Sequence, residues 1–383
     1  MKKNVISLLL CLSVYGGIIS CTERYENVNA LRLSSKDSLS YCFDSERTVT
    51  IKVGDKISNK PVSSQVVLTP GGEKYLLADL GHIYVFDWNS GELEDSIPTA
   101  ACGTINNYSG FAYISQDSIY VYNYSQKNLH LINSKGEVIK TRSLDKTNKR
   151  SHVVLDAEAI NRMRISRVDD RIVMSGSMFA SVKDMGDESC KATAMYDMTG
   201  SDLKGSLPFP RMYSSYNWGG IYMNVPNHCA GGRYMLYSYP VSHYVYRYGK
   251  DFSTCDSIYM GSRYCRSIRS FDGDALSALT DKNEMAKYFL SEHSYADIFY
   301  DGKNGRIYRL AYHPNEKWVP GEMFNQPFSV IVADEKGKIS CETRICDDPH
   351  YNWMNAHVTS CGLAVAYDCP DENVIIFRYL KKK

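Results

Sequence analysis

Residues 86–97 read FDWNSGELEDSI, and this pattern decides the fold because the chain repeats it. An apolar strand end leads into a short polar turn containing Gly or Asp, and a second short strand follows. Such a sequence is typical of a β-hairpin, whose turn needs a residue that tolerates positive φ. The other copies are LINSKGEVIKTR (131–142), YDMTGSDLKGSL (196–207), YRYGKDFSTCDSI (246–258) and VADEKGKISCET (332–343).

Another predicted strand pair precedes each hairpin, as in residues 74–79 with 82–87 and residues 118–124 with 129–133. One unit is therefore about four antiparallel strands. Gly91 and Gly136 lie 45 residues apart, which is the spacing of propeller blades. The longer interval from Gly136 to Gly200 indicates insertions in loops. The sequence thus predicts an all-β propeller with five complete blades.

The two ends of the chain complete the predicted ring. A sixth unit begins near Ala356 and supplies only three strands, which would leave an open sheet edge. The orphan strand at residues 48–53 (TVTIKV) fits that edge. We therefore expect a six-bladed β-propeller closed by an N-terminal strand. Seven blades are an alternative if residues 38–43 and part of an insertion pair separately, and a plain β-sandwich is a second alternative.

One segment departs from the β pattern. Residues 274–291 (DALSALTDKNEMAKYFLS) predict a short helical insertion. Asp281 with Glu284 resembles a capping box, and Met285, Ala286, Phe289 and Leu290 would then share one helical face. The insertion is either a decoration packed on the propeller or a lid over its central mouth.

The first twenty residues have the features of an export signal. Lys2 and Lys3 precede an apolar run at residues 5–14 (VISLLLCLSV), which is too short to span a bilayer. A small residue, Ser20, then stands directly before Cys21, as in the cleavage site of bacterial lipoproteins. We expect residues 1–20 to be removed and Cys21 to carry diacylglycerol and a further acyl chain such as palmitate.

The expected organisation is therefore an outer-membrane lipoprotein with one folded domain. Residues 21–36 would be the acylated cysteine and a polar tether, and residues 37–383 the propeller. The lipid on Cys21 would be the attachment to the membrane, on its periplasmic or its cell-surface side. The 44 basic and 43 acidic residues nearly balance, so no basic field indicates a nucleic-acid partner.

The cysteines do not indicate a disulfide scaffold. Twelve are present, of which Cys11 lies in the signal and Cys21 is acylated. A chain of this length buries a core without covalent cross-links, so most of the others are interpreted as small buried residues in strands. Cys341 with Cys346, and Cys361 with Cys369, are the nearest pairs in sequence if disulfides form.

Catalytic motifs are lacking in this sequence. It contains no G-x-S-x-G, H-E-x-x-H, C-x-x-C, phosphate-binding loop or D-x-D-x-D-G calcium loop. We therefore predict no catalytic residue, no metal site and no cofactor. A metal on the segment from His350 to His357 would need a third ligand from another blade, such as His313 or His243.

Three groups of residues are candidates for ligand binding. The segment HYNWMNAH contributes His350, Trp353, Asn355 and His357, and the aromatic loop YSSYNW (213–218) contributes Trp218. Flat aromatic rings beside amide and imidazole groups suit sugars or peptides, although they equally suit contacts between blades. The third group is Tyr308, Arg309 and His313, in which Arg309 would hold an anion or neutralise an acid such as Asp301.

The lipoprotein signal, the tether and the six-blade pattern resemble one known family. Residues 294–314 (SYADIFYDGKNGRIYRLAYHP), which follow the helical insertion, carry the most specific part of the likeness. The chain is similar to the uncharacterised six-bladed, TolB-like propeller lipoproteins of Gram-negative gut bacteria. This resemblance implies a fold and a compartment, and it implies no reaction.

The sequence thus favours a membrane-anchored envelope lipoprotein whose propeller is a binding module for a glycan, a peptide or a partner protein. The alternative is a propeller hydrolase or lyase acting on polysaccharide or peptide, which would need paired carboxylates or a metal at the channel mouth. A third hypothesis, a purely structural envelope component, predicts no deep polar pocket.

Overall fold

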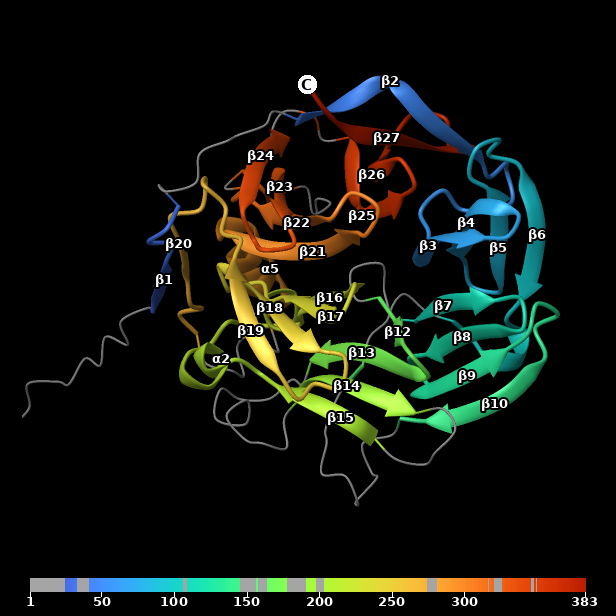
Figure 1. Cartoon of the computed structure of the whole chain (residues 1–383), viewed down its shortest axis with the longest axis horizontal. Coiled ribbons are helices and arrows are strands. Elements are labelled where there is room, and N and C mark those ends of the chain that lie inside the picture. Colours follow the sequence, from blue (N-terminus) through green and yellow to red (C-terminus); the bar gives the residue numbers. More distant parts are fainter. Residues whose placement is uncertain are drawn as a thin grey trace, which may run out of the picture.

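The computed structural model describes residues 25–32, 41–105, 109–144, 156–157, 164–177, 191–197, 203–273, 281–315, 317–319, 326–345, 348 and 350–383. In these residues, six antiparallel sheets of four or five strands surround a common centre (Figure 1). The predicted six-bladed β-propeller is therefore confirmed. The signal segment and Cys21 lie outside the described residues.

Each blade is a consecutive run of strands, except for the last. Blade 1 comprises β3 (Ser63–Thr69), β4 (Gly72–Ala78), β5 (His82–Asp87) and β6 (Leu93–Pro98). Blade 2 comprises β7 (Gly110–Ser115), β8 (Ser118–Asn123), β9 (Asn128–Ile132) and β10 (Val138–Ser143). Blade 3 comprises β11 (Asp156–Ala157), β12 (Ser166–Val168), β13 (Arg171–Ser177), β14 (Lys191–Asp197) and β15 (Leu203–Pro208).

The second half of the ring repeats this plan. Blade 4 comprises β16 (Asn227–Gly231), β17 (Tyr234–Ser238), β18 (Tyr244–Gly249) and β19 (Cys255–Tyr259). Blade 5 comprises β21 (Ser294–Asp301), β22 (Arg306–Tyr312), β23 (Phe328–Asp334) and β24 (Ile339–Ile345). Blade 6 comprises β25 (Tyr351–Thr359), β26 (Gly362–Tyr367), β27 (Val374–Lys382) and β2 (Tyr41–Lys52).

The ring closes through the strand that the sequence predicts. β2 runs antiparallel to β27, with Thr48 opposite Arg378 and Ile51 opposite Ile375. A bulge separates this stretch from Tyr41 to Phe43, which continue along the same partner. Of the residues proposed for a seventh blade, 41–43 therefore belong to blade 6, and residues 38–40 lie outside the described residues. Pairing the two ends of the chain removes the open edge that a three-stranded blade would expose.

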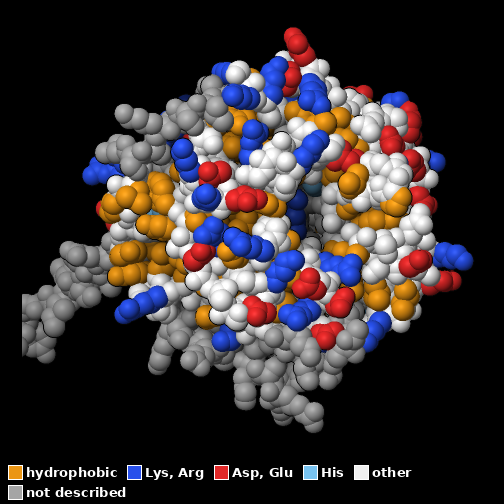
Figure 2. Space-filling view, in the orientation of Figure 1, with side chains coloured by type: hydrophobic (Ala, Val, Ile, Leu, Met, Phe, Trp, Pro, Cys, Tyr) orange, Lys and Arg blue, Asp and Glu red, His pale blue; other side chains and the backbone are white. Residues whose placement is uncertain are grey.

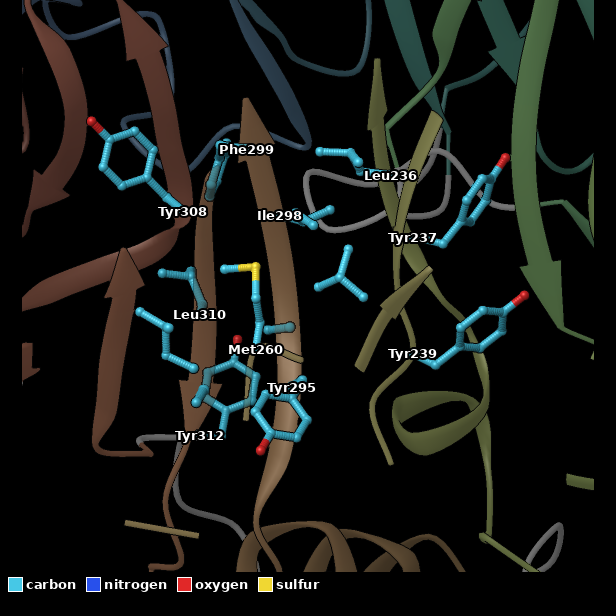
Figure 3. Close-up of a cluster of buried hydrophobic side chains, with 14 of the residues drawn as sticks. Leu236, Tyr237, Tyr239, Met260, Tyr295, Ile298, Phe299, Tyr308, Leu310 and Tyr312 are labelled. Carbon is cyan, nitrogen blue, oxygen red and sulfur yellow. The ribbon is translucent and has the colours of Figure 1, made fainter. Parts of the chain in front are cut away.

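The hydrophobic core lies between neighbouring blades. Central strands such as β8 and β23 are almost wholly buried, whereas β6 and β10 on the outside are mostly exposed. Figure 3 shows the contact between blades 4 and 5, where Leu236 of β17 faces Ile298 of β21 while Tyr237 points to the opposite side of its sheet. Both faces of a blade are thus covered, which explains why its central strands are continuously apolar.

The repeated hairpin turns hold the blades in register. Gly91, Gly136 and Gly337 all adopt positive φ, as the sequence predicts. At Gly136 a methyl group would overlap the carbonyl oxygen of Pro98 at the end of blade 1. The glycine is therefore needed for its backbone conformation and for the close approach of the preceding blade.

The helical insertion forms as α5 (Lys282–Ser291). The Asp281 side chain accepts hydrogen bonds from the amides of Asn283 and Glu284, so the predicted N-terminal cap is confirmed. The predicted apolar face is buried, with Met285 and Phe289 at 7% and 4% exposure. Residues 274–280 of the predicted insertion lie outside the described residues.

Short elements complete the described chain. They are η1 (Ala100–Cys102), α2 (Arg211–Ser215), α3 (Ile221–Asn224) and a two-stranded sheet of β1 (Glu26–Val28) with β20 (Ser267–Arg269). The tether predicted for residues 21–36 is therefore wrong for β1, which is fixed to the propeller. No helix in the described part of the chain is long and apolar enough to cross a membrane.

Cys42, Cys102, Cys229, Cys255, Cys265, Cys361 and Cys369 are free thiols. Cys361 and Cys369 are therefore not joined, and Cys346 lies outside the described residues. Cys102, Cys265 and Cys341 are buried, as interpreted from the sequence, whereas Cys255 and Cys361 are exposed.

Candidate functional site

A cavity of about 310 Å³ lies at the centre of the ring. All six blades contribute to its wall, through Ser64, Ala112, Arg164, His228, Phe299 and His357. Figure 2 shows the molecule hollowed near its centre in this view, with Lys or Arg side chains beside the hollow. We call this cavity the central channel.

Arg164, which precedes β12, is the main cation of the central channel. Its Nη2 donates a hydrogen bond to the carbonyl oxygen of Ala356, and its guanidinium lies 4.8 Å from the centre of the Phe299 ring. Burial lowers the pKa of Arg164, while the nearby Asp297 carboxylate opposes that shift. Arginine remains charged at neutral pH even so. The channel wall therefore holds a guanidinium whose charge is opposed by the nearby Asp297 carboxylate.

His357 belongs to a buried polar network between blades 6 and 1. Its Nε2 lies 2.8 Å from Asn355 Oδ1 and 3.1 Å from Ser64 Oγ. Asn355 Nδ2 donates to Tyr75 Oη at 3.0 Å. Because Asn355 Oδ1 is only an acceptor, Nε2 of His357 carries the proton and Nδ1 is left as an acceptor. Burial, with a smaller effect of Arg164, holds the pKa of His357 well below its usual value.

His228 of β16 is held in a similar way. Its Nδ1 lies 2.8 Å from Ser175 Oγ, and that hydroxyl is 3.0 Å from Thr193 Oγ1. Burial lowers the pKa of His228 to about 4, opposed by a hydrogen bond to the Val173 backbone. Nε2 of the ring has no hydrogen-bond partner in the described structure.

Two neutral imidazole rings, those of His228 and His357, therefore lie in the wall of the channel together with the guanidinium groups of Arg164 and Arg167. Nδ1 of His357, like Nε2 of His228, has no partner among the residues described. Arg164 depresses the pKa of both histidines, which places its charge within electrostatic reach of each. A ligand that fills the channel would lie beside these two rings and would meet Arg164 with an anionic group.

The channel lacks the groups that the hydrolase hypothesis needs. No Asp or Glu is among the described residues that line it, so no pair of carboxylates meets there. Burial raises the pKa of the Cys229 thiol to about 12, which removes it as a nucleophile near neutral pH. No group of three His, Cys, Asp or Glu suited to a metal occurs within the described ranges.

A larger cavity of about 690 Å³ lies between blades 1 and 2. Its cation, Lys74, is engaged by Asp87 at 2.9 Å and by Glu94 at 2.7 Å. Asp95 and Asp117 both raise the pKa of Tyr113 there, after the larger effect of burial. These carboxylates are turn and edge residues that the sequence analysis did not single out.

Arg309 is fully buried, so its side chain is not open to a ligand. Its side chain donates to Ser238 Oγ at 3.0 Å and to the carbonyls of Met260, Tyr239 and Ser242 at 2.8–3.3 Å. Burial lowers its pKa to about 10. Both predicted roles, holding an anion and neutralising Asp301, are therefore wrong. Arg309 joins blade 5 to the loops of blade 4.

Tyr308 and Trp218 are also structural. Tyr308 is buried, and its hydroxyl donates to Asp301 Oδ2 at 3.3 Å. Trp218 is buried and donates from Nε1 to the carbonyl of Met212 at 3.1 Å. The aromatic loop of residues 213–218 instead presents Tyr216, on which Tyr25 stacks at 3.8 Å between ring centres.

The histidines of the predicted site are dispersed. Nδ1 of His313 lies 3.4 Å from Nδ1 of His293. His313 is buried, and this burial lowers its pKa to about 3. His350 contacts Tyr367, with 5.5 Å between ring centres. Trp353 packs edge-on against Tyr312 at 4.6 Å. Of the eight predicted ligand-binding residues, the structure brings only Asn355 and His357 into hydrogen-bond contact, and His357 alone of the eight lines the channel.

The sequence analysis missed Ser64, Arg164 and His228. Each lies in or next to the first strand of its blade, which faces the centre of the ring. The sequence contains a signal for these residues. Polar residues in the first strand of several repeat units are expected to meet in one central channel. Aromatic clusters stand out more in the sequence, but they lie elsewhere, as Trp353 does in its contact with Tyr312 of blade 5.

Comparisons with known proteins agree with this architecture. A family profile described as "Domain of unknown function (DUF4221)" matches residues 40–338. A crystal structure of a DUF4221 protein from Bacteroides vulgatus is similar over 91% of this chain and 99% of that one, with 18% identity and a TM-score of 0.76. A Bacteroides fragilis protein described as a candidate exported protein is similar over 90% and 96%, with 13% identity and a TM-score of 0.56.

No curated protein sequence matches the chain significantly. The family match covers more than three quarters of the sequence. The chain therefore belongs to the DUF4221 family, in agreement with the resemblance to propellers of gut bacteria.

Proposed function

We propose that this DUF4221 chain is a lipid-anchored envelope protein whose propeller binds an acidic sugar or acidic glycan end in its central channel. Binding alone is proposed, with no bond made or broken. The lipid on Cys21 would hold the propeller at the outer membrane.

One observation carries the choice of ligand. The central channel combines a guanidinium, Arg164, with two buried imidazole nitrogens on His228 and His357 that lack described partners. Buried polar atoms without partners cost free energy, and a ligand that supplies hydrogen-bond donors recovers it. Sugar hydroxyls are such donors, and a sugar carboxylate, phosphate or sulfate matches Arg164.

The shape and lining of the channel support a sugar over a long peptide. A volume of about 310 Å³ lies at the lower end of the range for small-ligand pockets. Phe111 and Phe299 line the wall and offer apolar surface for the face of a sugar ring. A peptide would fit only through a terminal residue.

Export to the envelope is supported by the sequence and by one structural neighbour. Residues 1–21 carry the charged, apolar and cysteine parts of a lipoprotein signal in the required order. The similar Bacteroides fragilis protein is itself described as a candidate for export. A glycan ligand is consistent with a protein that is exported from the cytoplasm to the cell envelope.

The test is calorimetric titration with matched sugars. Glucuronate and galacturonate are compared with glucose and galactose, which lack the carboxylate. We expect the acids to bind at least tenfold more tightly, because a hydrogen bond to a charged group contributes about 1.5–3 kcal/mol. Arg164→Gln should remove this preference, and the exposed Arg211→Gln should retain it.

Equal binding of acidic and neutral sugars would contradict the role of Arg164. Binding to none of the four sugars would contradict the sugar proposal. The hydrolase or lyase alternative is tested in the same samples by looking for new reducing ends or unsaturated products with acidic polysaccharide. No feature of the channel favours that alternative, because its described lining contains no carboxylate.

A further inference from the structure

The N-terminal segment of residues 25–32, which we call the clasp, is fastened to the propeller beyond blade 4. The ring of Tyr25 stacks on Tyr216, with 3.8 Å between centres and 9° between planes. Next to it, β1 pairs with β20 so that Asn27 lies opposite Ile268. His243 Nε2 lies 2.9 Å from the carbonyl oxygen of Asn27. The clasp is therefore a fixed part of the fold.

Asn29 is the anchor of the clasp. Only 3% of it is exposed, and its Nδ2 donates to the carbonyls of Ser262 at 2.9 Å and Cys265 at 3.1 Å. Its Oδ1 accepts from the hydroxyl of Tyr259 at 2.8 Å. A buried amide satisfied on both sides holds the segment in one position.

Apolar side chains are exposed around this anchor. Val28 and Leu31 of the clasp are 57% and 44% exposed, and Tyr264 is 38% exposed between the two residues that Asn29 binds. Tyr244, which is 40% exposed, contacts Tyr259 with 5.8 Å between ring centres. Figure 2 shows hydrophobic side chains gathered at this edge, over β1 and β20. We call these four residues the clasp surface.

Exposed arginines accompany the clasp surface. Arg266 and Arg344 are exposed, and the Arg344 guanidinium lies 5.1 Å from the centre of the Tyr264 ring. Tyrosine and arginine beside aliphatic side chains are characteristic of surfaces that lie at a bilayer interface.

The acids nearby are mostly buried and paired. Glu292 is 4% exposed and bonds Arg269 at 2.7 Å, and Glu342 is 6% exposed with Arg263 at 3.8 Å. Glu26 is the exposed acid of the clasp. The outward charge near the clasp surface is therefore predominantly positive, which suits anionic lipid headgroups.

The length of chain before the clasp limits where the membrane can be. Four peptide units separate Cys21 from Tyr25, and they span at most about 14 Å when extended. If Cys21 carries lipid, as the proposed function holds, Tyr25 lies no farther than this from the acylated residue. The surface beside Tyr25 is then at the depth of the headgroups.

We propose that the clasp surface rests on the membrane that carries the Cys21 lipid, with Val28 and Leu31 reaching the boundary between headgroups and acyl chains. This inference rests on the lipid anchor of the proposed function and adds the orientation of the propeller. β1 and β20 lie at the outer edge of the ring, away from its centre (Figure 1). The membrane therefore meets the edge of the ring and leaves the central channel open.

Tryptophan quenching in vesicles tests this orientation. The lipidated mature protein is reconstituted with phosphatidylethanolamine and phosphatidylglycerol that carry brominated acyl chains. Val28→Trp and Leu31→Trp are compared with Leu68→Trp, since Leu68 is 80% exposed on blade 1. The unsubstituted protein, with four tryptophans, gives the background. We expect the added tryptophan of both clasp variants to be quenched at least twofold more than that of Leu68→Trp.

Equal quenching of the three variants would overturn the orientation, because a freely tumbling domain shows no preferred side. Stronger quenching of Leu68→Trp would place the blade 1 side of the molecule on the membrane and would overturn it as well. Intact mass is measured on each sample. A mass without added diacylglycerol would refute the lipid anchor itself. A mass with diacylglycerol but without the expected quenching pattern would refute only the proposed orientation.

Discussion

At the scale of single residues, the largest buried polar side chain acts in packing. Arg309 is fully buried, and its donors satisfy one hydroxyl and three carbonyl groups of blade 4 and the loops beside it. The guanidinium also lies 3.8 Å from the centre of the Tyr295 ring. A sequence motif cannot separate this role from ligand binding, because arginine serves both with the same planar donors.

Arg309→Met is therefore expected to lower stability and leave sugar binding intact. Loss of the guanidinium strands buried carbonyls, so the free energy of unfolding should fall by about 3 kcal/mol. Urea denaturation followed by circular dichroism measures the change, with exposed Arg211→Met as the control. A variant as stable as the original chain, or one that is stable but fails to bind ligand, would contradict the structural role.

Buried histidines predict how stability depends on pH. Burial lowers the pKa of His243 to about 4, whereas an unfolded histidine titrates near about 6.5. Between these values the unfolded chain binds more protons than the folded one, so the free energy of unfolding falls as the pH falls. Above about pH 6.5, the pKa of the unfolded-state histidine, the neutral ring makes its full contribution to the free energy of unfolding.

We expect His243→Gln to flatten this dependence. Each such histidine contributes a slope of up to about 1.4 kcal/mol per pH unit between pH 4 and 6.5. Urea titrations at several pH values measure the slope, and His82→Gln is the control because that ring is exposed to water. An unchanged slope in His243→Gln would show that its ring is not buried in the neutral form.

At the scale of elements, the hairpin turns were the most predictable part of the molecule. Asn133 Oδ1 accepts from the amides of Lys135 and Glu137 at 3.0 Å, as turn-forming side chains do. This chemistry is local, so the sequence reveals it. The contact of Gly136 with Pro98 of the preceding blade is not local, and no pattern within the hairpin predicts it.

Comparison of Gly136→Ala with Gly54→Ala separates the two reasons for glycine at such a turn, which are its positive φ and the close approach of the preceding blade. Gly54 has a similar φ, 69° against 76°, but has nothing within 4 Å of an added methyl group. We expect Gly54→Ala to cost about 1–2 kcal/mol from backbone strain. Gly136→Ala should cost about 1–3 kcal/mol more, because the added methyl group overlaps blade 1. Equal losses in the free energy of unfolding, measured by urea denaturation, would show that blades 1 and 2 can move apart at this contact to accommodate the added methyl group.

The clasp was the least predictable element. Its sequence is polar and short, which is typical of a tether, and its anchor Asn29 is held by residues more than 200 positions away. The strand pairing of β1 with β20 is equally remote in sequence. Long-range pairing of this kind leaves no periodicity in the segment itself.

At the scale of the whole molecule, the sequence predicted the ring better than its centre. Counting repeats and matching the spare strand at residues 48–53 to β27 was enough to predict six blades and their closure. The channel depends on one residue from each of several blades, such as Ser64, His228 and His357. Which strand residues converge there becomes visible only once the blades are placed around an axis.

The most direct test of the account is imidazole nitrogen NMR of the isotopically labelled protein as glucuronate is added, with His228→Gln and His357→Gln used for assignment. Both rings should be neutral near pH 6 without ligand, and both signals should shift together on binding. His82, which is exposed, should not respond. Shifts confined to His82 or other histidines outside the channel would contradict the claim that the centre of the propeller binds the ligand.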